Sequence, residues 1–207
     1  IDAIPLEDEP TSKRDADGDT YGICQFDRRG MRGAVVELTP DRIEDLIAMN
    51  ALYRPGTMDN IPSFIHRKHG REDVEYPHET LAAVLDETYG IIVYQEQVMR
   101  IASELAGFTL GEADVLRKAV GKKISELIRE ELGKFVDRCV ERGVERRVAL
   151  ELSNQIETFG RYGFNLSHSA AYSLISYHTA WLKVHYPEEF MAALFSSVLD
   201  NTDSVVK

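Results

Sequence analysis

The stretch from Tyr89 to Lys123 constrains the fold most, because its apolar side chains recur at helical spacing. In its first half, one face collects Tyr94, Gln97, Val98, Ile101 and Leu105. This periodicity predicts an amphipathic α-helix. Gly107 predicts the end of that helix, and a second helix follows it. The stretch therefore predicts two helices that are hinged at Gly107 and Phe108.

The second of these helices has a defined start and a basic end. Thr109 followed by Glu112 has the form of a capping box, in which each side chain satisfies a backbone N–H of the other. Base then collects at its end, at Arg117, Lys118, Lys122 and Lys123. Such a cluster can hold a polyphosphate. It can equally be the solvated end of a helix, since runs of charge usually face water.

The remainder of the chain also reads as helical. We expect further helices at residues 27–38, 39–52, 59–69, 79–86, 125–142, 145–158, 167–185 and 188–199. No segment shows sustained strand alternation, and no repeat or low-complexity linker interrupts the pattern. The sequence therefore predicts an all-α fold of about nine or ten helices, in a single domain over residues 1–207.

The first 52 residues carry three more specific predictions. Residues 1–20 are polar, acidic and rich in turn formers, so we expect irregular structure there. The short apolar run from Tyr21 to Phe26 is suited to a strand. Thr39 and Pro40 predict the start of a helix, with threonine as its cap and proline in its first turn.

Charge and composition restrict the class of protein. The formal net charge is −11, which argues against a surface that coats nucleic acid as a whole. Base is nevertheless concentrated locally, at residues 28–32, 66–71 and 117–123. No apolar run approaches the roughly 20 residues that span a bilayer. Two lone cysteines predict a reducing compartment. The chain starts without Met in what reads as a connecting segment, so we expect it to be part of a longer protein.

Other motifs in the sequence argue against several kinds of catalytic or metal site. His66 and His69 lie among cations that would repel zinc. Ser167 and His168 are adjacent on a predicted helix and cannot face each other, which argues against a serine hydrolase. No glycine-rich phosphate loop and no pair of carboxylates suited to two metals is evident. The polar run that follows Tyr162 to Asn165 suits either a capped helix start or an anion site.

Several longer phrases together resemble the alpha subunit of bacterial DNA polymerase III, a C-family replicative polymerase. The resemblance covers nearly the whole chain in the same order. Its phrases are GICQF with RGM at 22–31, DLIA with ALYRPG at 45–56, RKHG at 67–70, YGIIVYQEQ at 89–97, LRKA with GKK at 116–123, and YGFN with SHSAAY at 162–172.

This resemblance implies a fingers domain, with residues 1–20 as the connection from the palm. Fingers of this family bind the incoming deoxynucleoside triphosphate and template-primer DNA. The matching residues are Arg117, Lys118, Lys122, Lys123, Arg54, Asn165 and His168 for the nucleotide, and Arg28, Arg29 and Arg32 for DNA. The first two occupy the positions of a basic pair implied to touch the triphosphate, where fixed cations stabilise the charge that moves onto pyrophosphate.

The resemblance also implies the properties of a parent enzyme. It would be a cytoplasmic DNA-directed DNA polymerase with a sliding clamp and other replicase subunits as partners and with no membrane. Its palm would hold two Mg²⁺ ions, so this chain alone is expected to hold no cofactor and to be inactive.

Some positions depart from the family pattern. Lys118 stands where arginine is frequent, so a point charge replaces a two-pronged fork. Leu166 stands in place of a lysine, which removes a cation from the preceding turn, and Cys24 and Arg28 also differ. Two alternatives stay open: an error-prone polymerase of the same class, and a helical interaction module whose basic patches dock an acidic partner.

Overall fold

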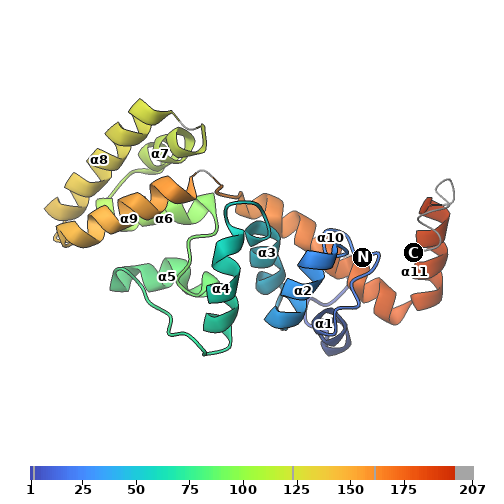
Figure 1. Cartoon of the computed structure of the whole chain (residues 1–207). Coiled ribbons are helices and arrows are strands. Elements are labelled where there is room, and N and C mark those ends of the chain that lie inside the picture. The colour runs from blue at the N-terminus through green and yellow to red at the C-terminus, as the bar shows by residue number, and fades with distance from the viewer. Residues whose placement is uncertain (2, 123, 161, 199–207) are drawn as a thin grey trace. The chain divides into compact units, whose positions relative to one another are not determined.

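The computed structural model describes residues 1, 3–122, 124–160 and 162–198 (Figure 1). Within these ranges the chain forms eleven α-helices and three short 3₁₀ helices, and it contains no β-strand. Tyr94 and Phe164 form an isolated bridge there. The all-α prediction is confirmed. Contacts divide the chain into two compact units, unit 1 with residues 1–50 and 170–207 and unit 2 with residues 51–169.

The N-terminal and C-terminal parts of the chain form unit 1. Its helices are α1 (Glu9–Ala16), α2 (Arg29–Leu38), most of α3 (Ile43–Leu52), most of α10 (Leu166–His185) and α11 (Pro187–Val198). The buried Lys183 of α10 donates hydrogen bonds to Asp19 Oδ1 at 2.6 Å and to Tyr21 O at 2.9 Å. An amine from α10 therefore fixes the segment that follows α1.

The prediction of irregular structure over residues 1–20 missed α1. Asp8 caps this helix, and its Oδ2 accepts hydrogen bonds from Thr11 N at 3.0 Å and Thr11 Oγ1 at 2.6 Å. Pro10 lies in the first turn, where its missing N–H costs nothing. An acidic segment of this composition can therefore be helical once its first N–H groups are satisfied.

Two other local predictions were wrong. Residues 21–26 form turns, with positive φ at Gly22 (74°) and Gln25 (67°), and left-handed residues cannot continue a strand. Thr39 ends α2 and does not cap the next helix: its φ is 46° and its N–H donates to Val35 O at 3.0 Å. The next helix, α3, begins at Ile43, later than predicted, and ends at Leu52 as expected.

Asp15 gives unit 1 an expected dependence on pH. Its side chain is 5% exposed, and its Oδ1 has no hydrogen-bond partner among the described residues. Burial raises the pKa of Asp15 from 3.8 to about 7, although Lys183 and Arg14 oppose this shift. Between these pH values the folded chain binds more protons than the unfolded chain, so it loses stability as the pH rises through that window.

We therefore expect Asp15→Asn to stabilise unit 1 at pH 8 by about 1–2 kcal/mol and to have a smaller effect at pH 5. Trp181 is the single tryptophan and lies on α10, so its fluorescence during urea unfolding measures this change. Asp17→Asn, at an exposed neighbouring carboxylate, is the control. An equal effect of Asp15→Asn at both pH values would contradict the prediction.

Unit 2 consists of a group of short helices followed by four longer ones. The short ones are η1 (Met58–Asn60), α4 (Ile61–Lys68), η2 (Glu79–Leu81), α5 (Ala82–Leu85) and η3 (Asp86–Thr88). The longer ones are α6 (Gln95–Ala106), α7 (Leu110–Lys122), α8 (Ser125–Glu141) and α9 (Arg146–Phe159), and they pack side by side (Figure 1). Their shared core contains Val98, Ile101, Leu116, Phe135 and Leu152.

The two helices expected around the Gly107 hinge are both present. Gly107 ends α6 with a φ of 61°, and its N–H donates to Ser103 O at 3.0 Å. The capping box at the start of α7 is confirmed, because Glu112 Oε2 accepts from Thr109 N at 2.8 Å and Thr109 Oγ1 accepts from Glu112 N at 3.3 Å. Hydrogen bonds to its carboxylate from Thr109 N, Thr109 Oγ1 and Arg138 Nη1 lower the pKa of Glu112 to about 2.

Candidate functional site

The basic pair on α7 is held by two neighbouring side chains. Arg117 donates from Nε at 2.9 Å and from Nη2 at 2.7 Å to Asp114 Oδ1. Lys118 Nζ lies 2.6 Å from the other oxygen of the same carboxylate. Arg117 Nη1 donates to Gln95 Oε1 on α6 at 3.2 Å. One carboxylate and one amide thus orient both cations of the pair.

The contact of Arg117 and Lys118 with the Asp114 carboxylate resembles the contact that the same pair would make with a phosphate. Nε and Nη2 of Arg117 donate to one carboxylate oxygen of Asp114. The same edge of the guanidinium can donate to two oxygens of a phosphate, as arginine does in bidentate pairs. The hydrogen bonds from Lys118 and Arg117 hold the pKa of Asp114 below its usual value. Asp114 therefore remains charged at neutral pH, and a phosphate that binds here must exchange with it.

Two further cations belong to the predicted cluster. Lys122 is exposed at the C-terminal end of α7, where a cation is favoured by the helix dipole. Lys123 lies outside the residues that the structure describes. The described part of the cluster therefore extends from Arg117 to Lys122 along the last turns of one helix.

Arg54 contacts the turn that contains Phe164. Its Cζ lies 3.8 Å from the centroid of the Phe164 ring, a cation–π distance. Its Nε is buried and has no hydrogen-bond partner within the described ranges, and burial lowers its pKa. The His168 ring meets Phe164 edge-on, with centroids 5.2 Å apart. Phe164 thus joins two of the residues selected from sequence.

Asn165 is the capping residue at the start of α10. Its Oδ1 accepts a hydrogen bond from His168 N at 2.8 Å, and its Nδ2 donates to Glu96 Oε1 at 2.7 Å. Glu96 Oε2 accepts from Leu166 N at 2.9 Å. The structure therefore contains the capped helix start that was one of the two alternatives for this motif. Both the oxygen and the nitrogen of the Asn165 amide form hydrogen bonds within the chain.

The first turn of α6 connects these groups. Gln95 contacts Arg117, and its Nε2 donates to Gly163 O at 3.1 Å while its backbone N–H donates to Phe164 O at 2.9 Å. Unit 2 therefore brings Arg117 and Lys118 into one hydrogen-bonded network with the motif that contains Asn165 and His168. Arg54 joins it through Phe164.

Three members of this network, Asp114, Gln95 and Glu96, were not among the residues predicted from the sequence. Asp114 could have been found, because residues three and four positions apart face each other on a helix and it precedes both cations at that spacing. Gln95 and Glu96 lie in the phrase YGIIVYQEQ that carries the resemblance, but no role was expected for either residue. Their partners lie 22 to 70 residues away in sequence, and the contacts exist only in the folded chain.

The predicted DNA-binding arginines lie in unit 1 at the start of α2. Arg28 precedes the helix and Arg29 begins it, and both are exposed. Arg32 lies one turn further and is partly buried. No acidic residue occupies this first turn. Cations at a helix N-terminus are disfavoured by the helix dipole, whereas an anion bound there is favoured.

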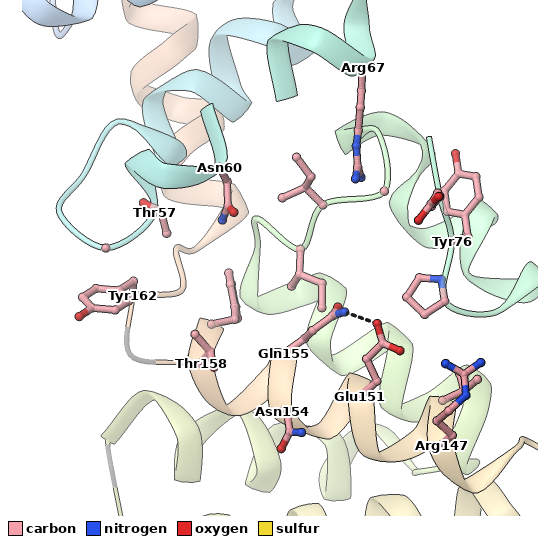
Figure 2. Close-up of a pocket in the computed structure, with 18 residues that line it drawn as sticks. Thr57, Asn60, Arg67, Tyr76, Arg147, Glu151, Asn154, Gln155, Thr158 and Tyr162 are labelled. Atoms are coloured by element: carbon pink, nitrogen blue, oxygen red, sulfur yellow. Dashed lines mark hydrogen bonds between the residues drawn. The ribbon is translucent and has the colours of Figure 1, made fainter. Parts of the chain in front are cut away.

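Unit 2 also contains an open groove of about 840 Å³, bordered by α4 and α9 (Figure 2). Amides and hydroxyls dominate its labelled residues, including Asn60, Asn154 and Gln155. Arg67 is already paired with Glu72 at 2.7 Å. Among the residues that the structure describes, none of those selected for nucleotide or DNA binding lines this groove. Its chemistry therefore differs from that of the basic network.

Within residues 1, 3–122, 124–160 and 162–198, no group of three or more His, Cys, Asp or Glu residues could hold a metal ion. Across the same ranges, no helix combines the length and the apolar character needed to cross a membrane.

Comparisons with known proteins agree on one family. The family model described as the bacterial DNA polymerase III alpha subunit finger domain matches residues 1–143. The DNA polymerase III subunit alpha of Bacillus subtilis (strain 168) is 49% identical over 205 residues, covering 99% of this chain and 18% of that protein. Those of Thermus aquaticus and Escherichia coli (strain K12) are 50% and 47% identical over the whole chain, which covers 17% and 18% of their lengths. The chain thus spans less than a fifth of these relatives.

Proposed function

The chain belongs to the finger-domain family of the bacterial DNA polymerase III alpha subunit, and from this premise we propose that it binds an incoming deoxynucleoside triphosphate through the basic pair of α7. The family match agrees with the resemblance found in the motifs and includes the whole of α7. The observation that carries the proposal is the presentation of Arg117 and Lys118 to a single oxyanion, Asp114.

The physical reason is the charge of a triphosphate. Its transfer reaction moves negative charge onto the departing pyrophosphate, and preorganised cations stabilise that charge. Arg117 would exchange the Asp114 carboxylate for phosphate oxygens with little change of orientation. Lys118 and Lys122 would add point charges along the same helix. Lys123 is included in the proposal from sequence.

Arg54, Asn165 and His168 are proposed to line the nucleotide or template side of this network. Arg54 is held against Phe164, which leaves its cation partly desolvated and strengthens its interaction with an anion. Asn165 would act through the shape of the turn that leads into α10, the helix that it caps. Arg28, Arg29 and Arg32 are proposed to contact the DNA backbone, where phosphate would offset the cost of cations at a helix N-terminus.

The parent protein is proposed to be a DNA-directed DNA polymerase in which this chain forms the fingers and residues 1–20 lead from the palm. Two Mg²⁺ ions held outside this chain would activate the primer 3′-hydroxyl and stabilise the leaving group. The fingers alone would be inactive. Template-primer DNA, a sliding clamp and other replicase subunits are the proposed partners, and the cytoplasm is the proposed location.

Two variants of the parent polymerase test both halves of the proposal. Lys118→Ala is expected to raise KM for the incoming nucleotide about fivefold, because it removes one charge-assisted contact, and to leave primed-DNA binding unchanged. Arg29→Ala is expected to reduce the slope of log Kd against log salt by about one, because it removes one phosphate contact, and to leave KM unchanged. Each variant is the control for the other.

An interaction module that docks an acidic protein partner predicts a different outcome. Neither variant would then change nucleotide KM or the salt dependence of DNA binding. Unchanged values for Lys118→Ala would contradict the triphosphate contact, and an unchanged slope for Arg29→Ala would contradict the DNA contact.

A further inference from the structure

The side chain of Gln95 is bonded at both ends to groups that belong to different motifs. Its Oε1 accepts a hydrogen bond from Arg117 Nη1 at 3.2 Å. Its Nε2 donates to Gly163 O at 3.1 Å, and its backbone N–H donates to Phe164 O at 2.9 Å. One residue of α6 therefore spans the distance between α7 and the turn that leads into α10.

A primary amide suits this position for a chemical reason. It has an acceptor for the guanidinium and a donor for a backbone carbonyl, and it carries no charge. A carboxylate would lack the donor and would repel an incoming phosphate. The neighbouring Glu96 has the complementary role, since its carboxylate accepts hydrogen bonds from Asn165 Nδ2 and Leu166 N. Gln95 and Glu96 together therefore hold the segment that leads into α10. Of these two residues, Gln95 is the one that also holds Arg117.

The two partners of Arg117 differ in what a phosphate would do to them. Asp114 holds Nε and Nη2, which form the two-donor edge that a phosphate oxygen would use. Gln95 holds Nη1, on the other side of the guanidinium. A negatively charged ligand competes with the Asp114 carboxylate for Nε and Nη2. It does not compete with the neutral Gln95 amide, which is bonded to Nη1. Gln95 can therefore keep Arg117 in place while Asp114 is exchanged.

We propose that Gln95 is a positioning residue for nucleotide binding, which holds the Arg117 guanidinium against the turn at Gly163 and Phe164 while phosphate replaces Asp114. This inference rests on the proposed function, because it takes Arg117 as the triphosphate contact. Gln95 acts through Arg117 and touches no reacting atom. Its loss affects nucleotide binding and leaves the rate of the bound complex nearly unchanged.

The test is a double-mutant cycle in the parent polymerase with single-nucleotide incorporation as the assay. Gln95→Met keeps the length of the side chain and removes both hydrogen bonds. It is expected to raise KM for the incoming nucleotide about tenfold with kcat within about twofold. In an Arg117→Ala background the same change is expected to raise KM by less than about twofold. Gln155→Met, at an exposed glutamine of α9, is the matched control and is expected to leave KM unchanged.

The outcomes separate the two claims. If Gln95→Met keeps the wild-type KM while Arg117→Ala raises it, the positioning role is overturned and the proposed function stands. An equal loss from Gln95→Met in both backgrounds also overturns it, because a general structural effect does not depend on Arg117. If Arg117→Ala itself keeps the wild-type KM, the proposed function fails and the positioning role fails with it.

Discussion

Replacing Arg117 with alanine in the parent polymerase is expected to lower kcat/KM for nucleotide incorporation by about 100- to 1,000-fold, the usual cost of removing one preorganised donor at a site of developing charge. Two effects contribute. The variant loses the two-donor edge that would contact the triphosphate. It also releases the Asp114 carboxylate, which Arg117 holds through Nε and Nη2. The freed carboxylate would then face the incoming phosphates with only Lys118 to neutralise it.

The second effect can be measured separately by steady-state incorporation assays. Arg117→Ala combined with Asp114→Asn is expected to recover about tenfold of the lost kcat/KM, because one repulsive charge is removed. Arg129→Ala, at an exposed arginine of α8, is a control for charge alone and should keep the wild-type value. A loss of less than about threefold for Arg117→Ala would rule out a direct contact with the triphosphate.

The helices of unit 2 could be predicted because each has a local cause. The apolar stripe of α6, the αL residue Gly107 at its end and the capping box of α7 all act within one or two turns of helix. The errors lie where two local signals compete. Thr39 precedes a proline and reads as a cap, yet its N–H completes the last turn of α2 and places the residue in the left-handed region.

The N-terminal segment shows a different limit. Asp8 and Pro10 are ordinary signals for a helix start, but they were outweighed by an acidic and weakly apolar composition. What stabilises this region is partly remote, since Lys183 and His185 of α10 contact Asp19 and Asp8. Contacts across more than 160 residues leave no periodic trace in the sequence. Composition alone therefore underestimates the order of such a segment.

The candidate site also contains residues that local sequence signals reveal and residues that only the folded chain brings together. The basic pair was found from a charge cluster and a family motif, and Asp114 lies at helical spacing from it. The part played by Gln95 and Glu96 depends on how α6, α7 and the turn before α10 meet. Two residues that were noted only as part of a family phrase are therefore the ones that join separate motifs.

The packing of α7 against the end of α9 is expected to be most sensitive to added side-chain volume at Gly160. It follows α9 with φ −63° and ψ −15°, a backbone conformation that alanine adopts without strain. A Cβ there would nevertheless overlap Val120 of α7, and it would lie 2.7 Å from the Val120 Cβ, which rotation of the side chain cannot move. Gly160→Ala is therefore expected to destabilise unit 2 by about 2–3 kcal/mol through overpacking. Amide hydrogen exchange in α7 and α9 measures this loss.

Gly133→Ala is the matched control, because it makes the same chemical change within the same group of helices. Gly133 lies inside α8, and a Cβ there would meet no described atom within 4 Å. Alanine is the better helix former, so this variant is expected to stabilise unit 2 by about 0.5–1 kcal/mol. If Gly160→Ala lowers the stability of unit 2 and Gly133→Ala raises it, the loss at Gly160 comes from the close approach of α7 and α9 and not from helix propensity. If Gly160→Ala also increased protection, α9 would not end against Val120, and the placement of Arg117 beside the following turn would lose its structural basis.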